Sequence, residues 1–157
     1  MQRLYALAVI MDSEHGRGLQ HILTELSNWC DARPVRLCVC FGSQATGRAR
    51  AASDVDVAIW PRGDVSLRDG LRWIAELEER LATPVSLVIV TPNLNPVLGF
   101  EIVRDGRPAY EESPGLWQHR RAQLWHAYND SLPFRRAARE MLRAFARESA
   151  QETRHGA

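Results

Sequence analysis

Two aspartates have the residue type and spacing of a metal site. Asp54 and Asp56 stand two residues apart at the start of an apolar run that ends at Trp60. On a strand, both carboxylates would face the same way, roughly 7 Å apart along the backbone. Two such anions repel each other unless a cation lies between them. We therefore predict that Asp54 and Asp56 are the catalytic pair and bind Mg²⁺, which takes carboxylate oxygens and completes its shell with water and phosphates.

A Gly-Ser pair supplies a second feature. Gly42 and Ser43 follow the apolar run 35–41, and ten residues separate Ser43 from Asp54. Glycine lets the backbone approach a ligand closely, and N–H groups at such a turn can bind phosphate oxygens. We expect Gly42 and Ser43 to bind the triphosphate of a nucleotide, so that the two motifs together indicate nucleotidyl transfer. Turn geometry for Gly42 and a helix N-cap for Ser43 are the simpler interpretations.

Three other side chains are candidates for the nucleotide site. Ser53 precedes the first aspartate and could steady the acidic turn. Arg48 and Arg50 lie on the segment between the two motifs and could reach a triphosphate. A solvated loop arginine explains both equally well.

The sequence pattern predicts a small mixed β-sheet flanked by helices, an α/β (α+β) fold. Helical spacing over 67–81 has Ser66 as its N-cap and an apolar stripe that includes Leu67 and Leu71. The segment 105–114 is rich in turn residues, and the chain from 115 onward is helical with a break near residues 132–133. We expect one domain over 1–112 and a helical extension over 113–157. Further strands are expected at 35–41, 55–60 and 85–90, and further helices at 17–30, within 44–53 and at 97–104.

Composition limits the possible functions. The chain has 157 residues, 45% of them hydrophobic, with a net charge of +1. This size suits one ordinary domain, and the charge argues against an extended nucleic-acid surface. The apolar segment 4–11 is too short to span a bilayer, so we expect no membrane association and a cytoplasmic protein. Three cysteines, Cys30, Cys38 and Cys40, provide no disulfide framework and are expected to be buried.

The motifs resemble those of a known family. Segments 41–47, 53–59 and 98–107 are similar to the corresponding parts of minimal nucleotidyltransferases of the DNA polymerase β superfamily. The resemblance implies the polymerase β-like fold, with Mg²⁺ as cofactor and ATP as substrate. Polymerases of this superfamily carry a third carboxylate on a later strand, where this chain has Ser86. Glu101 and Glu111 are both open as replacements, and Ser86 places catalysis in question.

The tail around 128–135 resembles antitoxins that are paired with HEPN toxins. This resemblance implies a hetero-oligomer in which AMP passes from Mg-ATP to a tyrosine of the toxin and silences its ribonuclease. A nucleotidyltransferase fold that acts by binding alone, and an enzyme that modifies a small molecule, are the alternatives.

Four arginines in the tail stand four residues apart and would share one side of a helix. We predict that they bind the partner, although a solvated helix face paired with nearby glutamates is the simpler interpretation. These residues are Arg135, Arg139, Arg143 and Arg147.

Overall fold

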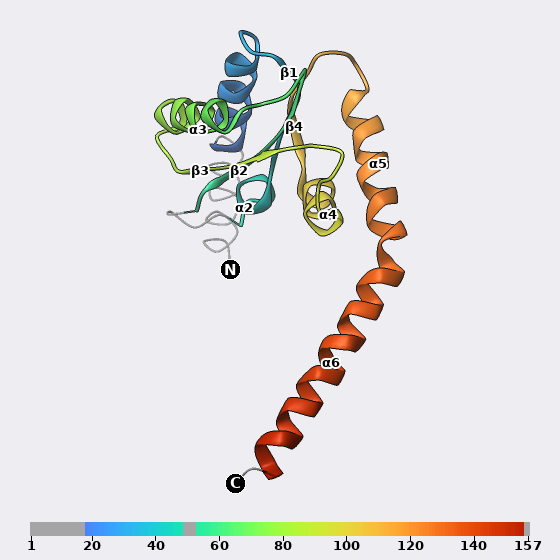
Figure 1. The fold of residues 1–157 in the computed structure, drawn as a ribbon. Coiled ribbons are helices and arrows are strands. Elements are labelled where there is room, and N and C mark those ends of the chain that lie inside the picture. Colours follow the sequence, from blue (N-terminus) through green and yellow to red (C-terminus); the bar gives the residue numbers. More distant parts are fainter. Residues whose placement is uncertain (1–17, 49–52, 156–157) are drawn as a thin grey trace, which may run out of the picture.

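A mixed four-stranded sheet, with strand order β3-β2-β1-β4, forms the centre of the fold in the computed structural model (Figure 1). The structure describes residues 18–48 and 53–155. Strand β1 (Val35–Phe41) pairs antiparallel with β2 (Val55–Pro61) and with β4 (Arg107–Glu111). Strand β3 (Val85–Ile89) is parallel to β2. The expected mixed sheet with flanking helices is confirmed.

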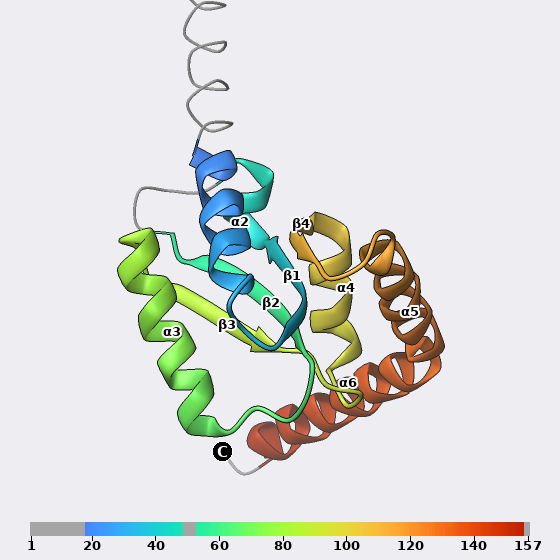
Figure 2. The same ribbon diagram turned by 90° about the horizontal axis from the view of Figure 1, so that it is seen from above.

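Helices cover both faces of this sheet (Figure 2). Residues 18–30 are helical and lie with α3 (Leu67–Leu81) on one face. Helices α4 (Pro96–Asp105) and α5 (Leu116–Asp130) cover the other face. The short α2 (Gly42–Thr46) follows β1, and α6 (Leu132–His155) continues from α5 after the expected break.

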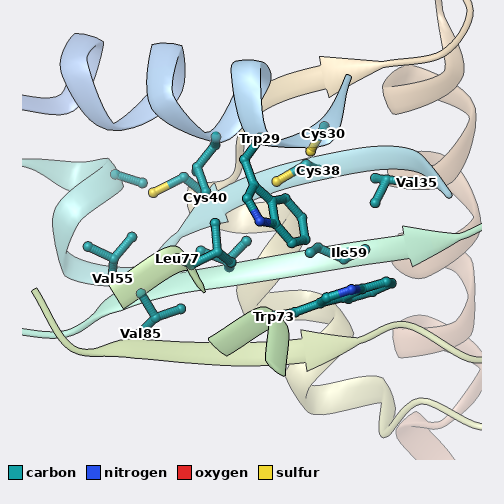
Figure 3. Close-up of a cluster of buried hydrophobic side chains, with 13 residues drawn as sticks. Trp29, Cys30, Val35, Cys38, Cys40, Val55, Ile59, Trp73, Leu77 and Val85 are labelled. Carbon is teal, nitrogen blue, oxygen red and sulfur yellow. The ribbon is translucent and has the colours of Figure 1, made fainter. Parts of the chain in front are cut away.

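The core beneath residues 18–30 and α3 centres on two tryptophans (Figure 3). Trp29 meets Trp73 edge to face, with ring centroids 5.6 Å apart. The three cysteines are also buried here, as expected. Burial, followed by the nearby Asp56 carboxylate, raises the pKa of the Cys40 thiol to about 12. Cys40 is therefore a neutral core residue at physiological pH.

The alternate side chains of each strand pack into a second core on the opposite face, because successive side chains of a strand point to opposite faces. Trp60 of β2 meets Trp117 of α5, with ring centroids 6.4 Å apart. The remaining buried members of this cluster are Leu37, Val39, Phe41, Ala58 and Ile102. Asp56 stands two residues before Ala58 on β2, so it points to the same face of the sheet, the face that α4 covers.

The stripe expected for α3 is wrong at its start. The helix has the expected bounds, and the Ser66 hydroxyl accepts a hydrogen bond from the Asp69 N–H at 3.1 Å. However, Leu67 is 82% exposed and Leu71 is 58% exposed, whereas Trp73 is 5% exposed. Trp73 sets the buried face through its contact with Trp29, and a residue two positions away points to the far side of the helix.

Segment 105–114 contains a strand that the sequence pattern did not reveal. Strand β4 pairs with β1 at the edge of the sheet and includes Pro108. Proline is tolerated on an edge strand, where one N–H faces solvent, yet it removes the usual strand signal.

Among the described helices, none has the length and apolar character that a bilayer span requires. The apolar segment 4–11 lies outside the described residues. The domain boundary at 112 stays a prediction.

Candidate active site

Gly42 and Asp56 meet where β1 ends. In the β1–β2 register Phe41 lies opposite Asp56, and α2 begins at the next residue, Gly42. Gly42 has a φ of 72°, and a Cβ placed on it would overlap Asp56 Oδ2 and lie 3.1 Å from its Cγ. Glycine therefore serves two needs here: it adopts the left-handed conformation, and it leaves room for the carboxylate. The sheet register brings the two predicted motifs into contact.

Ser86 is the next neighbour of Asp56. Strands β2 and β3 pair Asp56 with Ser86, and the Ser86 hydroxyl donates a hydrogen bond to the Asp56 carboxylate. The position at which the polymerases carry a third acid therefore holds a neutral hydroxyl beside the metal-ligand candidate.

The electrostatics of Asp56 favour a cation. Burial raises the pKa of this carboxyl above its ordinary value, and the hydrogen bond from Ser86 opposes that shift. The negative charges of Asp54 and Glu101 raise the pKa further. A half-buried carboxylate with two anionic neighbours is relieved by a divalent ion. The donor set therefore suits Mg²⁺, which Asp54 and Asp56 would hold.

Protein groups alone do not complete a metal shell here. Over the described ranges, no cluster of three or more His, Cys, Asp or Glu side chains is arranged to hold a metal ion. Mg²⁺ usually keeps several waters and binds through one or two carboxylates plus substrate phosphates. A pair of carboxylates such as Asp54 and Asp56 fits this mode of binding.

The turn around Ser43 is held by its own backbone. The Ser43 carbonyl accepts hydrogen bonds from the N–H groups of Gly47 and Arg48, the latter at 3.0 Å. Phe41, the residue before α2, has no side-chain oxygen with which to cap the helix. The first N–H groups of α2 can therefore donate to a phosphate oxygen.

Gln44 is a site residue that the sequence reasoning missed. Its Nε2 donates a hydrogen bond to the Ser53 carbonyl at 3.1 Å. This bond ties the Gly-Ser helix to the residue before Asp54, so Gln44 acts as a positioning residue. Its place inside the 41–47 motif was the available signal.

The two glutamates that were open as a third acid have different roles. Glu111 accepts hydrogen bonds from the N–H groups of Gly115 and Trp117, at 3.3 and 3.1 Å, and so caps the start of α5. Glu101 lies on α4 and acts electrostatically on Asp56. Of these two glutamates, Glu101 is the one whose charge acts on Asp56.

None of the remaining arginine candidates is shown in contact with the aspartate pair within the described chain. Arg48 is exposed after α2, and Arg50 falls outside the described residues. The Arg135 guanidinium stacks on Tyr128, 3.8 Å from the ring centroid, and donates to the Tyr128 carbonyl at 2.9 Å. The other three tail arginines are exposed on α6, which leaves the body of the molecule (Figure 1).

A groove in the structure lies away from the aspartate pair. A groove of about 880 Å³ runs between the far ends of β2 and β3 and helix α5, and neither aspartate lines it. The geometry of the candidate active site comes from the register of β1, β2 and β3.

The family model "Polymerase beta, Nucleotidyltransferase" matches residues 24–115. No curated protein sequence matches the chain. Among solved structures, a toxin–antitoxin with AMP-PNP has a TM-score of 0.66 and 18% identity, and covers 79% of this chain and 97% of its own.

Two other solved structures show the same fold. A tri-AMPylated Shewanella oneidensis HEPN toxin in complex with an MNT antitoxin gives a TM-score of 0.62 at 16% identity, over 82% of this chain and 98% of that chain. The MntA-HepT toxin–antitoxin gives 0.62 at 16% identity, over 81% and 97%. At such identities the similarity establishes a shared fold.

Proposed function

This chain belongs to the polymerase β nucleotidyltransferase family, and we propose that it is the antitoxin of a HEPN toxin–antitoxin pair that transfers AMP from ATP to a tyrosine of the toxin. Structures with this fold include a toxin–antitoxin with AMP-PNP and an AMPylated HEPN toxin with its MNT antitoxin. These properties belong to those proteins, and they support the proposal for this one.

One observation carries the proposal: the Asp56 carboxylate rests against the Cα of Gly42. Metal ligand and phosphate-binding turn are thus one site, as transfer from a metal-bound nucleotide requires. Asp54 and Asp56 would hold Mg²⁺, and Gly42 and Ser43 would hold the triphosphate. Bound Mg²⁺ supplies charge neutralisation of the phosphates.

The proposed transfer is a substitution at the α-phosphorus of ATP. The tyrosine oxygen forms a bond to the α-phosphorus, the bond from that phosphorus to the β-bridging oxygen breaks, and pyrophosphate leaves. The phenolic proton must pass to a base. We assign this proton to Glu101, because Ser86 is neutral and Glu111 is engaged at the start of α5.

A paired substitution tests this base. We expect Glu101→Gln to lower the transfer rate by about 10²–10⁴-fold, the usual effect of losing a general base. Glu111→Gln should lower thermal stability through the weakened α5 cap and leave the rate per folded molecule unchanged. Equal rates for wild type and Glu101→Gln would remove Glu101 from this role.

The proposed function itself is tested with radiolabelled ATP, Mg²⁺ and the HEPN protein encoded beside this chain. We expect label on a toxin tyrosine with wild type and none with Asp54→Ala. Asp64→Ala, at the far end of β2, is the matched control and should transfer AMP normally. Full neutralisation of the toxin by Asp54→Ala, without label, would contradict the enzymatic proposal.

Ser86 favours a second candidate function, in which the chain neutralises its partner by binding alone. A neutral hydroxyl stands at the strand position opposite Asp56. A stable complex without modification would support this candidate. Labelling of a small molecule in the absence of any protein partner would instead support the small-molecule transferase.

A further inference from the structure

Helix α5 packs on α4 along one stripe of side chains. A Cβ on Gly99 of α4 would lie 3.2 Å from Leu124 Cδ2, so the two helices are in close contact there. Tyr128 stacks on Phe100 of α4, with ring centroids 4.3 Å apart and an interplanar angle of 19°. Leu124 and Tyr128 are four residues apart and mark the face of α5 that points to α4.

The same spacing continues into α6, where α4 is absent. Steps of three and four residues lead from Tyr128 through Ser131 and Arg135 to Ala138 and Leu142. Helix α4 begins at Pro96, and within the described chain the main contact of α6 is with α5. Figure 1 shows α6 extending away from the body of the molecule. The face of α5 that packs on α4 therefore continues onto α6, whereas α4 does not extend beside α6.

Large apolar side chains on α6 are exposed to solvent. Phe134 is 79% exposed, Met141 74% and Leu142 67%. With Ala138 they fall within about 100° of the helix circumference, at 100° per residue. We name Phe134, Ala138, Met141 and Leu142 the α6 apolar stripe. A contiguous exposed apolar patch of this kind marks an interaction site.

We propose that the α6 apolar stripe binds an amphipathic, acidic helix of a partner protein, which lies beside α6 as α4 lies beside α5. This inference deepens the proposed function and rests on it for the partner, the HEPN toxin. The bound helix would supply the apolar side chains that α4 supplies to α5.

Charge selects an acidic partner over a second copy of this chain. Helix α6 contains six arginines and three glutamates, a net charge of +3. A second α6 would bring the same positive net charge close to the contact, with Arg139 at its edge, and like charges near an interface are unfavourable. An acidic helix would be attracted, and this attraction weakens with added salt.

The position of the α6 apolar stripe also changes the interpretation of the four tail arginines that were predicted to bind the partner. Four-residue steps rotate by about 40° each, so the line drifts around the helix. Arg135 already stacks on Tyr128 at the α5–α6 joint. Arg139 flanks the stripe, and Arg143 and Arg147 turn to the opposite face. We therefore assign the binding energy to the apolar stripe and the attraction of the partner to the arginines.

Matched double substitutions test this surface. We expect Met141→Gln with Leu142→Gln to weaken binding of the neighbouring HEPN protein by about 10²-fold, because buried apolar anchors dominate interface energy. Arg136→Gln with Arg143→Gln, on the opposite face, should weaken it by less than about tenfold and reduce its salt dependence. All these side chains are exposed, so both variants should keep wild-type helicity by circular dichroism. Wild-type affinity in the Met141/Leu142 variant would overturn the inference.

Two further measurements separate this inference from the proposed function. Asp54→Ala should bind the HEPN protein like wild type and transfer no AMP. A complex that depends on the stripe without any AMP transfer would contradict the enzymatic proposal alone. In sedimentation of the chain by itself, we expect a monomer. A dimer that the Met141/Leu142 variant abolishes would overturn the inference, because a second copy would then be the occupant.

Discussion

Gly42 and Asp56 occupy adjoining space: the Asp56 carboxylate lies where a Cβ on residue 42 would be. Gly42 is the first residue of α2, and Asp56 is the second residue of β2. Their contact joins the proposed phosphate-binding turn to the proposed metal-binding carboxylate. The proposed chemistry depends on this contact more than on either motif separately.

Gly42→Ala should abolish transfer by displacing the Asp56 carboxylate, and it should also lower stability. Gly47→Ala is the matched control, because Gly47 has nearly the same φ, 71°, and open space around its Cα. A non-glycine residue in this conformation costs about 1–2 kcal/mol. Both variants should therefore melt at a lower temperature, and only Gly42→Ala should lose activity. Equal activity of the two folded variants would show that the Gly42–Asp56 contact is unimportant.

Ser86→Asp should increase AMP transfer, because it places a carboxylate beside Asp56 on the neighbouring strand. A gain of about 10²-fold would show that a carboxylate on β3 is a better general base than Glu101. Ser86→Asn, similar in size and uncharged, is the control and should give no gain. The rates are measured under single-turnover conditions with saturating Mg-ATP. A loss of activity in Ser86→Asp would indicate that added negative charge at this position opposes the reaction.

The raised pKa of Asp56 predicts that a rise in pH lowers the stability of the metal-free protein. Mg²⁺ is expected to raise the stability. Burial raises its pKa, and Asp54 and Glu101 add to the shift against the hydrogen bond from Ser86. The folded state therefore holds the Asp56 proton more tightly than the unfolded state, whose aspartates titrate near about 3.9. Without metal, this group lowers stability as the pH rises from that value through the raised pKa.

Thermal melting measures how stability depends on pH and on Mg²⁺. Without metal at pH 7, Asp56→Asn should melt no lower than wild type, since it removes a disfavoured charge. Mg²⁺ should stabilise wild type by about 2.7 kcal/mol at one hundred times its Kd and leave Asp56→Asn unchanged. At acidic pH the Mg²⁺ effect should vanish as Asp56 is protonated. Equal stabilisation of both proteins by Mg²⁺ would place the metal elsewhere.

Glu76 should stabilise the fold away from the site. Its carboxylate accepts hydrogen bonds from Trp29 Nε1 at 3.0 Å and from Arg33 Nη2 at 2.6 Å. Although burial raises the pKa of Glu76, these hydrogen bonds lower it below its ordinary value. The resulting stability is present above the unfolded pKa and is lost as the pH falls through the folded one.

Glu76→Gln should thus cost on the order of 1 kcal/mol of unfolding free energy at pH 7, a modest value because the carboxylate is partly exposed. Urea denaturation measures it, and the exposed Glu79→Gln on the same helix is the control. A Glu76→Gln variant as stable as wild type at pH 7 would show that the cluster contributes nothing.

The amino-acid sequence alone determined the local features of this protein. Apolar runs and the Ser66 cap predicted β1, β2, β3 and α3 closely, because strand and helix periodicity is written in neighbouring residues. The spacing of Gly42, Ser43, Asp54 and Asp56 predicted a metal and phosphate site for the same reason. The alternation of strand side chains predicted that both aspartates share one face.

Only the tertiary structure decided which residues from distant segments meet. Strand pairing put Ser86 beside Asp56, and the packing of α4 brought Glu101 near while Glu111 capped α5. Pairing with β1 made β4 a strand despite Pro108, and Trp73 turned Leu67 and Leu71 outward. Such contacts depend on register and on side-chain packing across the fold, and neither is encoded in local periodicity.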